Sequence, residues 1–91
     1  MKADELREVA DVCRMLADAT RVTIVAILAK GTKTVGALCS ELKLPQPTVS
    51  HHLALLRMSR MTHRVRKGKQ MLYSLNREML APAKQFLATL K

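Results

Sequence analysis

The sequence predicts a mainly α-helical (α+β) fold with elements in the order α-α-α-α-β-β-α. Apolar residues recur at helical spacing along most of the chain, and the period falls to two only within residues 62–75. Tyr73 and Phe86 are the only aromatic residues, so the core must be aliphatic, which suits packed helices better than a β-sandwich. A length of 91 residues predicts a single domain, residues 1–91.

Two helices are expected at the start of the chain. An apolar stripe at spacing i, i+3, i+4, i+7 predicts the first, over residues 4–17, from Leu6, Val9, Ala10, Cys13, Leu16 and Ala17. Asp18 is the expected N-cap of the second, which runs from Ala19 to Lys30. This second helix is apolar on nearly all sides, which is typical of a buried central helix. Gly31 then fits a left-handed C-terminal cap.

Two prolines separate the third and fourth helices. Thr34 is the expected cap of a short third helix, and Pro45 and Pro47 interrupt the helical pattern after it. Pro47 suits the first turn of a fourth helix that ends near Ser59. The inward stripe of this helix is Val49, Leu53 and Leu56. His52, at the edge of that stripe, is expected to form a core or inter-helix hydrogen bond.

A basic hairpin and a last helix complete the pattern. The strands are expected at residues 62–65 and 70–75, and Gly68 in the connection between them supplies the positive φ of a tight turn. Asn76 is the expected cap of a final helix over residues 77–90. Pro82 lies inside that segment and should kink the helix or move its start to Ala81.

The charge distribution predicts a polyanionic partner. Lys and Arg outnumber Asp and Glu by 16 to 7, and the formal net charge is +9. Most of the acids lie in the first eighteen residues, and none lies between Glu41 and Glu78. The binding face is therefore expected within that acid-free window, on the fourth helix and the hairpin.

The third and fourth helices with the hairpin predict a winged helix-turn-helix that binds double-stranded DNA. In this arrangement the N-terminal residues of the second helix reach base edges in the major groove. Short polar side chains suit that task, and the predicted base-reading residues are Gln46, Thr48, Ser50 and His51. The basic residues around them are predicted to bind phosphates: Arg57, Arg60, Arg64, Arg66, Lys67 and Lys69.

Residues from Leu16 to about Leu75 resemble the ArsR/SmtB family of winged-helix repressors. The resemblance is carried by Leu16-Ala17-Asp18-Ala19-Thr20-Arg21, Val35-Gly36-Ala37-Leu38, Thr48-Val49-Ser50-His51-His52-Leu53, Arg66-Lys67-Gly68-Lys69 and Tyr73-Ser74-Leu75. It implies a homodimer built on the first and last helices, which binds an imperfect palindrome and releases it when an effector arrives. Two residues depart from the pattern. Arg60 stands where the family often has Gly, so this corner is expected to be built differently, and Pro45 replaces a capping Ser.

The ligand sets that the resemblance would supply are incomplete, so no metal and no cofactor are expected. The third helix has Cys39-Ser40-Glu41 where the family's thiolate site has Cys-x-Cys, and no His follows His63. Cys13 and Cys39 each lie on an apolar stripe, which favours buried structural thiols. The alternative is a thiol-based redox switch or an inter-subunit soft-metal site that uses both cysteines.

Other classes of function fit the sequence less well. An enzyme is not expected, because no Gly-rich phosphate loop and no Ser/His/Asp spacing occurs. A peripheral membrane protein would need Trp or bulky apolar residues opposite the basic strip, and Trp is absent. A dimeric interaction adaptor that has lost DNA binding is the remaining alternative. With no signal-peptide pattern, the sequence predicts a cytoplasmic protein with reduced thiols.

Overall fold

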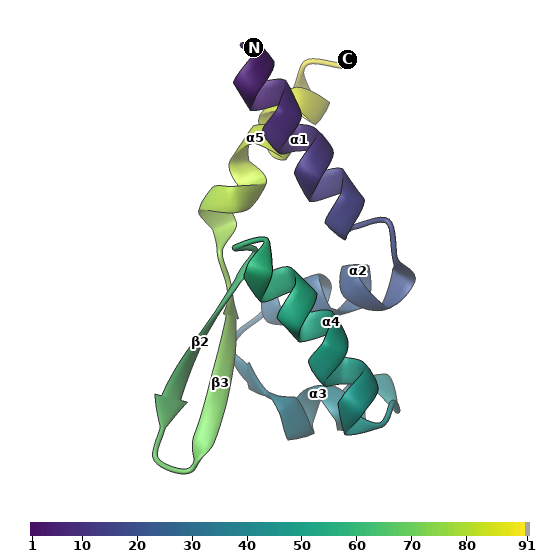
Figure 1. Ribbon diagram of the computed structural model, residues 1–91, viewed down its shortest axis with the longest axis vertical. Coiled ribbons are helices and arrows are strands. Elements are labelled where there is room, and N and C mark those ends of the chain that lie inside the picture. The colour runs from purple at the N-terminus through teal and green to yellow at the C-terminus, as the bar shows by residue number, and fades with distance from the viewer. Residues whose placement is uncertain (91) are drawn as a thin grey trace.

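The computed structural model describes residues 1–90, which form an elongated molecule of 42 × 24 × 21 Å. Within these residues the elements are α1 (Ala3–Met15), α2 (Ala19–Leu28), β1 (Lys33–Thr34), α3 (Val35–Leu42), α4 (Gln46–Met58), β2 (Thr62–Lys67), β3 (Gln70–Leu75) and α5 (Arg77–Ala88). Figure 1 shows two regions. The body contains α2, α3, α4 and the strands, and the arm contains α1 and α5, which cross near the two termini.

The predicted mainly α, winged helix-turn-helix fold is confirmed, with one additional strand. β3 is the central strand of an antiparallel sheet in the order β1-β3-β2. β1 has two residues and pairs Lys33 with Tyr73, so it ties the start of α3 to the hairpin. Sequence periodicity could not find it, because two residues are too few to show a period of two.

The core lies in the body, between the helices and the sheet. Its fully buried apolar side chains come from α2, α3, α4 and the segment before β2, and they are Ile24, Leu38, Val49, Leu53, Leu56 and Met61. The predicted inward stripe of α4 is therefore confirmed. The expectation of a fully buried α2 is wrong, because Val22 is 45% exposed and only Ile24 and Leu28 of this helix are buried. α2 covers one side of the body and presents its other side to solvent.

Two predicted helix caps are confirmed, and two further expectations are not. The Asp18 carboxylate accepts hydrogen bonds from two backbone amides at the start of α2, and the Thr34 hydroxyl accepts one from Ala37 N (3.1 Å). Asn76 precedes α5 but makes no side-chain cap. Gly31 has φ of 154°, outside the αL well near +57°, so it does not form the expected left-handed cap.

The arm is less well packed than the body. Val9 and Val12 of α1 are buried, but no residue of α5 is. Leu6, Leu87 and Leu90 are 45%, 66% and 62% exposed, so the two helices leave much of their apolar surface uncovered. Pro82 lies inside α5 without moving its start to Ala81. No helix within residues 1–90 has the length and apolar character needed to cross a bilayer.

Candidate nucleic-acid interface

A sharp turn connects α3 to α4. α3 ends at Leu42, and Lys43 adopts a left-handed conformation (φ 56°, ψ 43°) that reverses the chain. Leu44 N then donates to Cys39 O at 3.3 Å, which satisfies a carbonyl at the end of α3. A left-handed residue other than Gly costs roughly 1–2 kcal/mol. Because Gly and Asn are the residues that signal this conformation, Lys43 gave no indication of it in the sequence.

α4 begins without a side-chain cap, as its proline-rich start predicts. Pro45 is the N-cap residue, and its carbonyl accepts from Thr48 N and Val49 N at 3.1 and 3.2 Å. Pro47 lies in the first turn, where its missing amide donor costs nothing. The N-terminal end of α4 lies at the end of the molecule remote from the arm, at the same end as the hairpin turn (Figure 1). Both elements are thus available to one ligand.

The four predicted base-reading residues lie on the first half of α4. Gln46 and His51 are exposed, whereas Thr48 and Ser50 are half-buried. Within residues 1–90, none of these four side chains makes a hydrogen bond to the rest of the chain. Their donors and acceptors are therefore available to a partner, as direct readout of base edges requires.

The corner after α4 is built on Arg60, and the expectation of a different construction is wrong. Arg60 has φ of 61°, the left-handed conformation that Gly usually supplies. Its carbonyl accepts from Asn76 Nδ2 at 2.8 Å, and Asn76 N donates to Met61 O at 2.9 Å. Asn76 therefore holds the corner instead of capping α5. These bonds offset the strain and keep Arg60 exposed beside the hairpin.

The hairpin carries its basic residues on both faces. Facing residues of an antiparallel pair project to the same side. Arg64 pairs with the buried Tyr73, so Arg64 and Arg66 share the core-facing side of the sheet, while Lys67 projects from the other. The two-residue turn places Gly68 at φ 64°, a value that only Gly adopts readily.

Among residues 1–90, no carboxylate forms an ion pair with this basic surface. The ion pairs among residues 1–90 join Arg14 to Asp11 and Lys33 to Glu41, and the Asp18 carboxylate lies 3.9 Å from His52 Nδ1, so all these carboxylates lie outside the predicted phosphate-binding set. The members of that set are all exposed, and they are Arg57, Arg60, Arg64, Arg66, Lys67 and Lys69. Unpaired cations around a row of free polar side chains can bind a phosphate backbone and hold the polar side chains against the bases.

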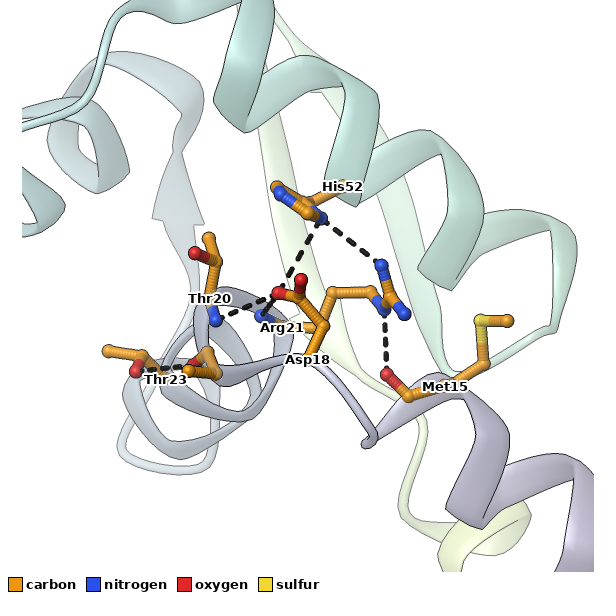
Figure 2. Close-up of polar contacts among 7 residues, drawn as sticks. Met15, Asp18, Thr20, Arg21, Thr23 and His52 are labelled. Carbon is orange, nitrogen blue, oxygen red and sulfur yellow. Dashed lines mark hydrogen bonds and ion pairs between the residues drawn. The ribbon is translucent and has the colours of Figure 1, made fainter.

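His52 projects from the inner side of α4 and contacts α2, which confirms its predicted inter-helix hydrogen bond. His52 Nδ1 lies 3.3 Å from an Arg21 guanidinium nitrogen and 3.9 Å from Asp18 Oδ1 (Figure 2). The Asp18 carboxylate also accepts from Thr20 N (2.8 Å) and Arg21 N (3.1 Å). The Arg21 amide is the largest influence on the pKa of Asp18 and lowers it below the ordinary value of 3.8. Burial opposes this as the second-largest influence, and the electrostatic effect of His52, the Thr20 amide and the Arg21 charge lower the pKa further.

The two cysteines lie in different environments. Cys39 is half-buried in α3 and packs against the core, as expected of a structural thiol. Cys13 is exposed on α1, so its predicted burial is wrong for the single chain. In the described part of the chain, the structure brings together no group of three His, Cys, Asp or Glu side chains that could hold a metal.

A sharp helix-turn-helix, a polar first half of the second helix and a basic hairpin define a winged helix-turn-helix DNA-binding protein. The family model for bacterial regulatory proteins of the arsR family matches residues 18–61. The HTH-type transcriptional regulator KmtR of Mycobacterium tuberculosis is 43% identical over 82% of this chain and 58% of its own length. The transcriptional repressor SdpR of Bacillus subtilis is 33% identical over 77% of this chain and 78% of its own length.

The chain belongs to the ArsR family of transcriptional regulators, whose members are DNA-binding proteins and not enzymes. A solved structure with the same fold is the homodimeric winged helix-turn-helix DNA-binding domain of Mb0332 from Mycobacterium bovis. It has a TM-score of 0.77 and 24% identity, and it covers 96% of this chain and 82% of its own. The matched part of this chain therefore spans 58% of the length of KmtR and 78% of the length of SdpR.

Proposed function

We propose that this chain is a homodimeric transcriptional repressor that binds an imperfect palindrome in double-stranded DNA. The observation that carries the proposal is that the start of α4, with its free polar side chains, and the basic hairpin turn lie at the same end of the molecule, remote from the arm. Such a regulator acts where the genome lies, which is the cytoplasm in bacteria such as those that contain KmtR and SdpR.

In this proposal the two sets of residues have different tasks. Gln46, Thr48, Ser50 and His51 read base edges in the major groove, where an amide or hydroxyl distinguishes one base pair from another. Arg57, Arg60, Arg64, Arg66, Lys67 and Lys69 bind phosphates, which supplies affinity without selecting sequence. Lys67 and Lys69 lie on either side of Gly68 at the tip of the hairpin and are proposed to lie over the neighbouring minor groove.

The second copy is proposed to cover the arm. Leu6 and Leu87 are exposed on the two crossing helices and Leu90 just beyond α5, and apolar surface of this kind favours association. The homodimeric state of the Mb0332 domain, which has the same fold, supports the same assembly here. Two symmetric copies present two α4 helices to the DNA, so the operator should repeat its half-site with inverted polarity.

The proposed repressor uses none of the family's usual metal sites, because its histidines, cysteines and acids are dispersed over the described residues. The exposure of Cys13 favours a second candidate, in which oxidation or a soft metal bound with Cys39 at the dimer interface releases the DNA. An effector that binds the arm would release the DNA in the same way.

Selection from random duplexes tests the proposal. The purified chain should enrich a near-palindrome whose half-sites lie about one helical turn apart. Recovery of every duplex alike, with strong salt dependence, would contradict sequence-specific repression. No binding to any duplex would favour the alternative of an interaction adaptor that has lost DNA binding. Repeating the selection without reductant and with added Zn²⁺ tests the thiol candidate, because loss of binding under either condition would make Cys13 and Cys39 the sensor.

A further inference from the structure

The recognition helix α4 is fixed to the body by an apolar stripe and one polar link. Val49, Leu53 and Leu56 are essentially fully buried in the core. Among the α4 side chains of the described region, His52 is the one that forms a hydrogen bond or ion pair with another element. The packed stripe fixes α4 on the body, because protein cores are close-packed. The polar link adds a contact that depends on distance and angle, and it is the one that connects α4 to the end of α1.

That link continues to the arm through Arg21. The Arg21 guanidinium donates from Nε to Met15 O at 2.7 Å, and its Nη1 donates to His52 Nδ1 at 3.3 Å (Figure 2). Met15 is the last residue of α1, so a single planar side chain contacts both the arm and the recognition helix. Because guanidinium has no acceptor, Nδ1 of His52 is the acceptor in this hydrogen bond.

The charged groups around His52 all belong to this junction. Asp18 Oδ1 lies 3.9 Å from Nδ1, and the ring of His51 lies 5.6 Å away, centroid to centroid. Asp18 is itself held by two amides of α2, so it anchors the junction to the body. The side chain of His52 is only 14% exposed and faces inward, away from the surface proposed to bind DNA.

We propose that Arg21 and His52 are positioning residues that set the spacing of the two half-sites read by the dimer. This inference rests on the proposed function. In a dimer joined at the arm, the angle between α1 and α4 decides how far apart the two recognition helices lie and how they are phased along the DNA. An inward-facing His52 leaves the reading of each half-site unchanged but controls which spacing both copies can occupy together.

The test compares duplexes in which two identical half-sites lie at the selected spacing or one base pair closer or farther. Arg21→Lys keeps the charge but loses the fork that contacts two acceptors at once. His52→Leu removes the acceptor, and His52→Asn retains one near Nδ1. Arg77→Lys is the matched control, because Arg77 donates to the C-cap carbonyl of α2 (Ala29 O, 2.7 Å) and, within the described residues, forms no hydrogen bond or ion pair with α4. Circular dichroism checks the fold of each variant.

We expect Arg21→Lys and His52→Leu to reduce the preference for the selected spacing roughly tenfold, the effect of losing a hydrogen bond to a charged group. Affinity for a single half-site should stay nearly constant, His52→Asn should recover much of the preference, and Arg77→Lys should behave as the unaltered chain. An unchanged preference in a folded Arg21→Lys or His52→Leu variant would overturn the inference, as would an equal loss in Arg77→Lys. Indifference of the unaltered chain to spacing would instead overturn the proposed palindrome.

Discussion

The body and the arm of this molecule differ in how completely each buries its apolar residues. In the body, Ile24, Leu38 and Leu56 are fully buried, and the sheet closes one side of the core. In the arm, α5 has no buried residue, and Leu87 and Leu90 are more than half exposed. The body is complete as a single chain, whereas the arm needs a further apolar surface.

This difference separates two tasks within a short chain. A chain of 91 residues builds only a thin core, and here most of that core holds the recognition helix and the hairpin in place. In the proposed dimer, the arm contributes to stability mainly through a second copy. The proposed dimerisation and DNA reading would then be connected through few contacts, of which the Arg21 junction is one.

The largest expected effect is the loss of stability when a core residue of the body is truncated. Leu38→Ala should lower the free energy of unfolding by about 2–5 kcal/mol, because a fully buried leucine leaves a cavity. Met58→Ala, at a side chain that is 76% exposed, should change it by less than about 0.5 kcal/mol. Urea titration measures both values. Similar losses in the two variants would mean that the body is not the well-packed region.

The next effect concerns the arm. Leu87→Glu would bury an unpaired carboxylate in the proposed dimer interface, and it should weaken dimerisation by roughly a hundredfold or more. Gln85→Glu adds the same charge on the opposite side of α5 and should leave the dimer intact. Sedimentation at micromolar concentration measures the outcome. A Leu87→Glu dimer as stable as that of Gln85→Glu would place the interface elsewhere.

Within the DNA-binding end, α4 and the hairpin should respond differently. Ser50→Ala or His51→Ala should cost about 1–3 kcal/mol of discrimination at one base position. Lys67→Ala should weaken binding to all duplexes alike and reduce the slope of log affinity against log salt by about one. Titrations at several salt concentrations distinguish these effects. If Lys67→Ala changed base preference and left the salt slope alone, the two roles would be wrongly assigned.

The smallest effect is the pH dependence at Asp18. Its pKa is lowered in the folded state, so its stabilising contribution is fully present above the unfolded pKa near 3.8 and is lost as the pH falls through the lower folded value. Asp18→Asn keeps a capping acceptor but removes the charge. The unaltered chain should therefore have the higher Tm at pH 7, and the gap should shrink below pH 3.8. A gap that is constant with pH would show that the carboxylate charge contributes nothing.

Most of the body could be predicted from the sequence, because its elements follow strong local rules. Apolar periodicity located the helices, Asp18 and Thr34 marked two helix starts, and Gly68 marked the hairpin turn. The acid-free window also indicated which end of the molecule carries the unpaired basic residues.

The features that escaped prediction depend on contacts distant in sequence. Arg60 adopts a left-handed conformation because Asn76 bonds to its carbonyl from sixteen residues away, and no local signal reports this. β1 exists only by pairing with β3. The exposure of Cys13 follows from which side of α1 the single copy of α5 covers, and a helical stripe alone does not reveal how much of it a neighbour will bury.

The most direct test of the account is the stoichiometry of the complex on a selected palindromic duplex, measured by sedimentation of the free chain, the free duplex and the mixture. The account predicts a dimer in the free state and two chains per duplex in the complex. A monomer that binds one chain per duplex with full sequence preference would contradict it, because the uncovered arm would then have no part in DNA recognition.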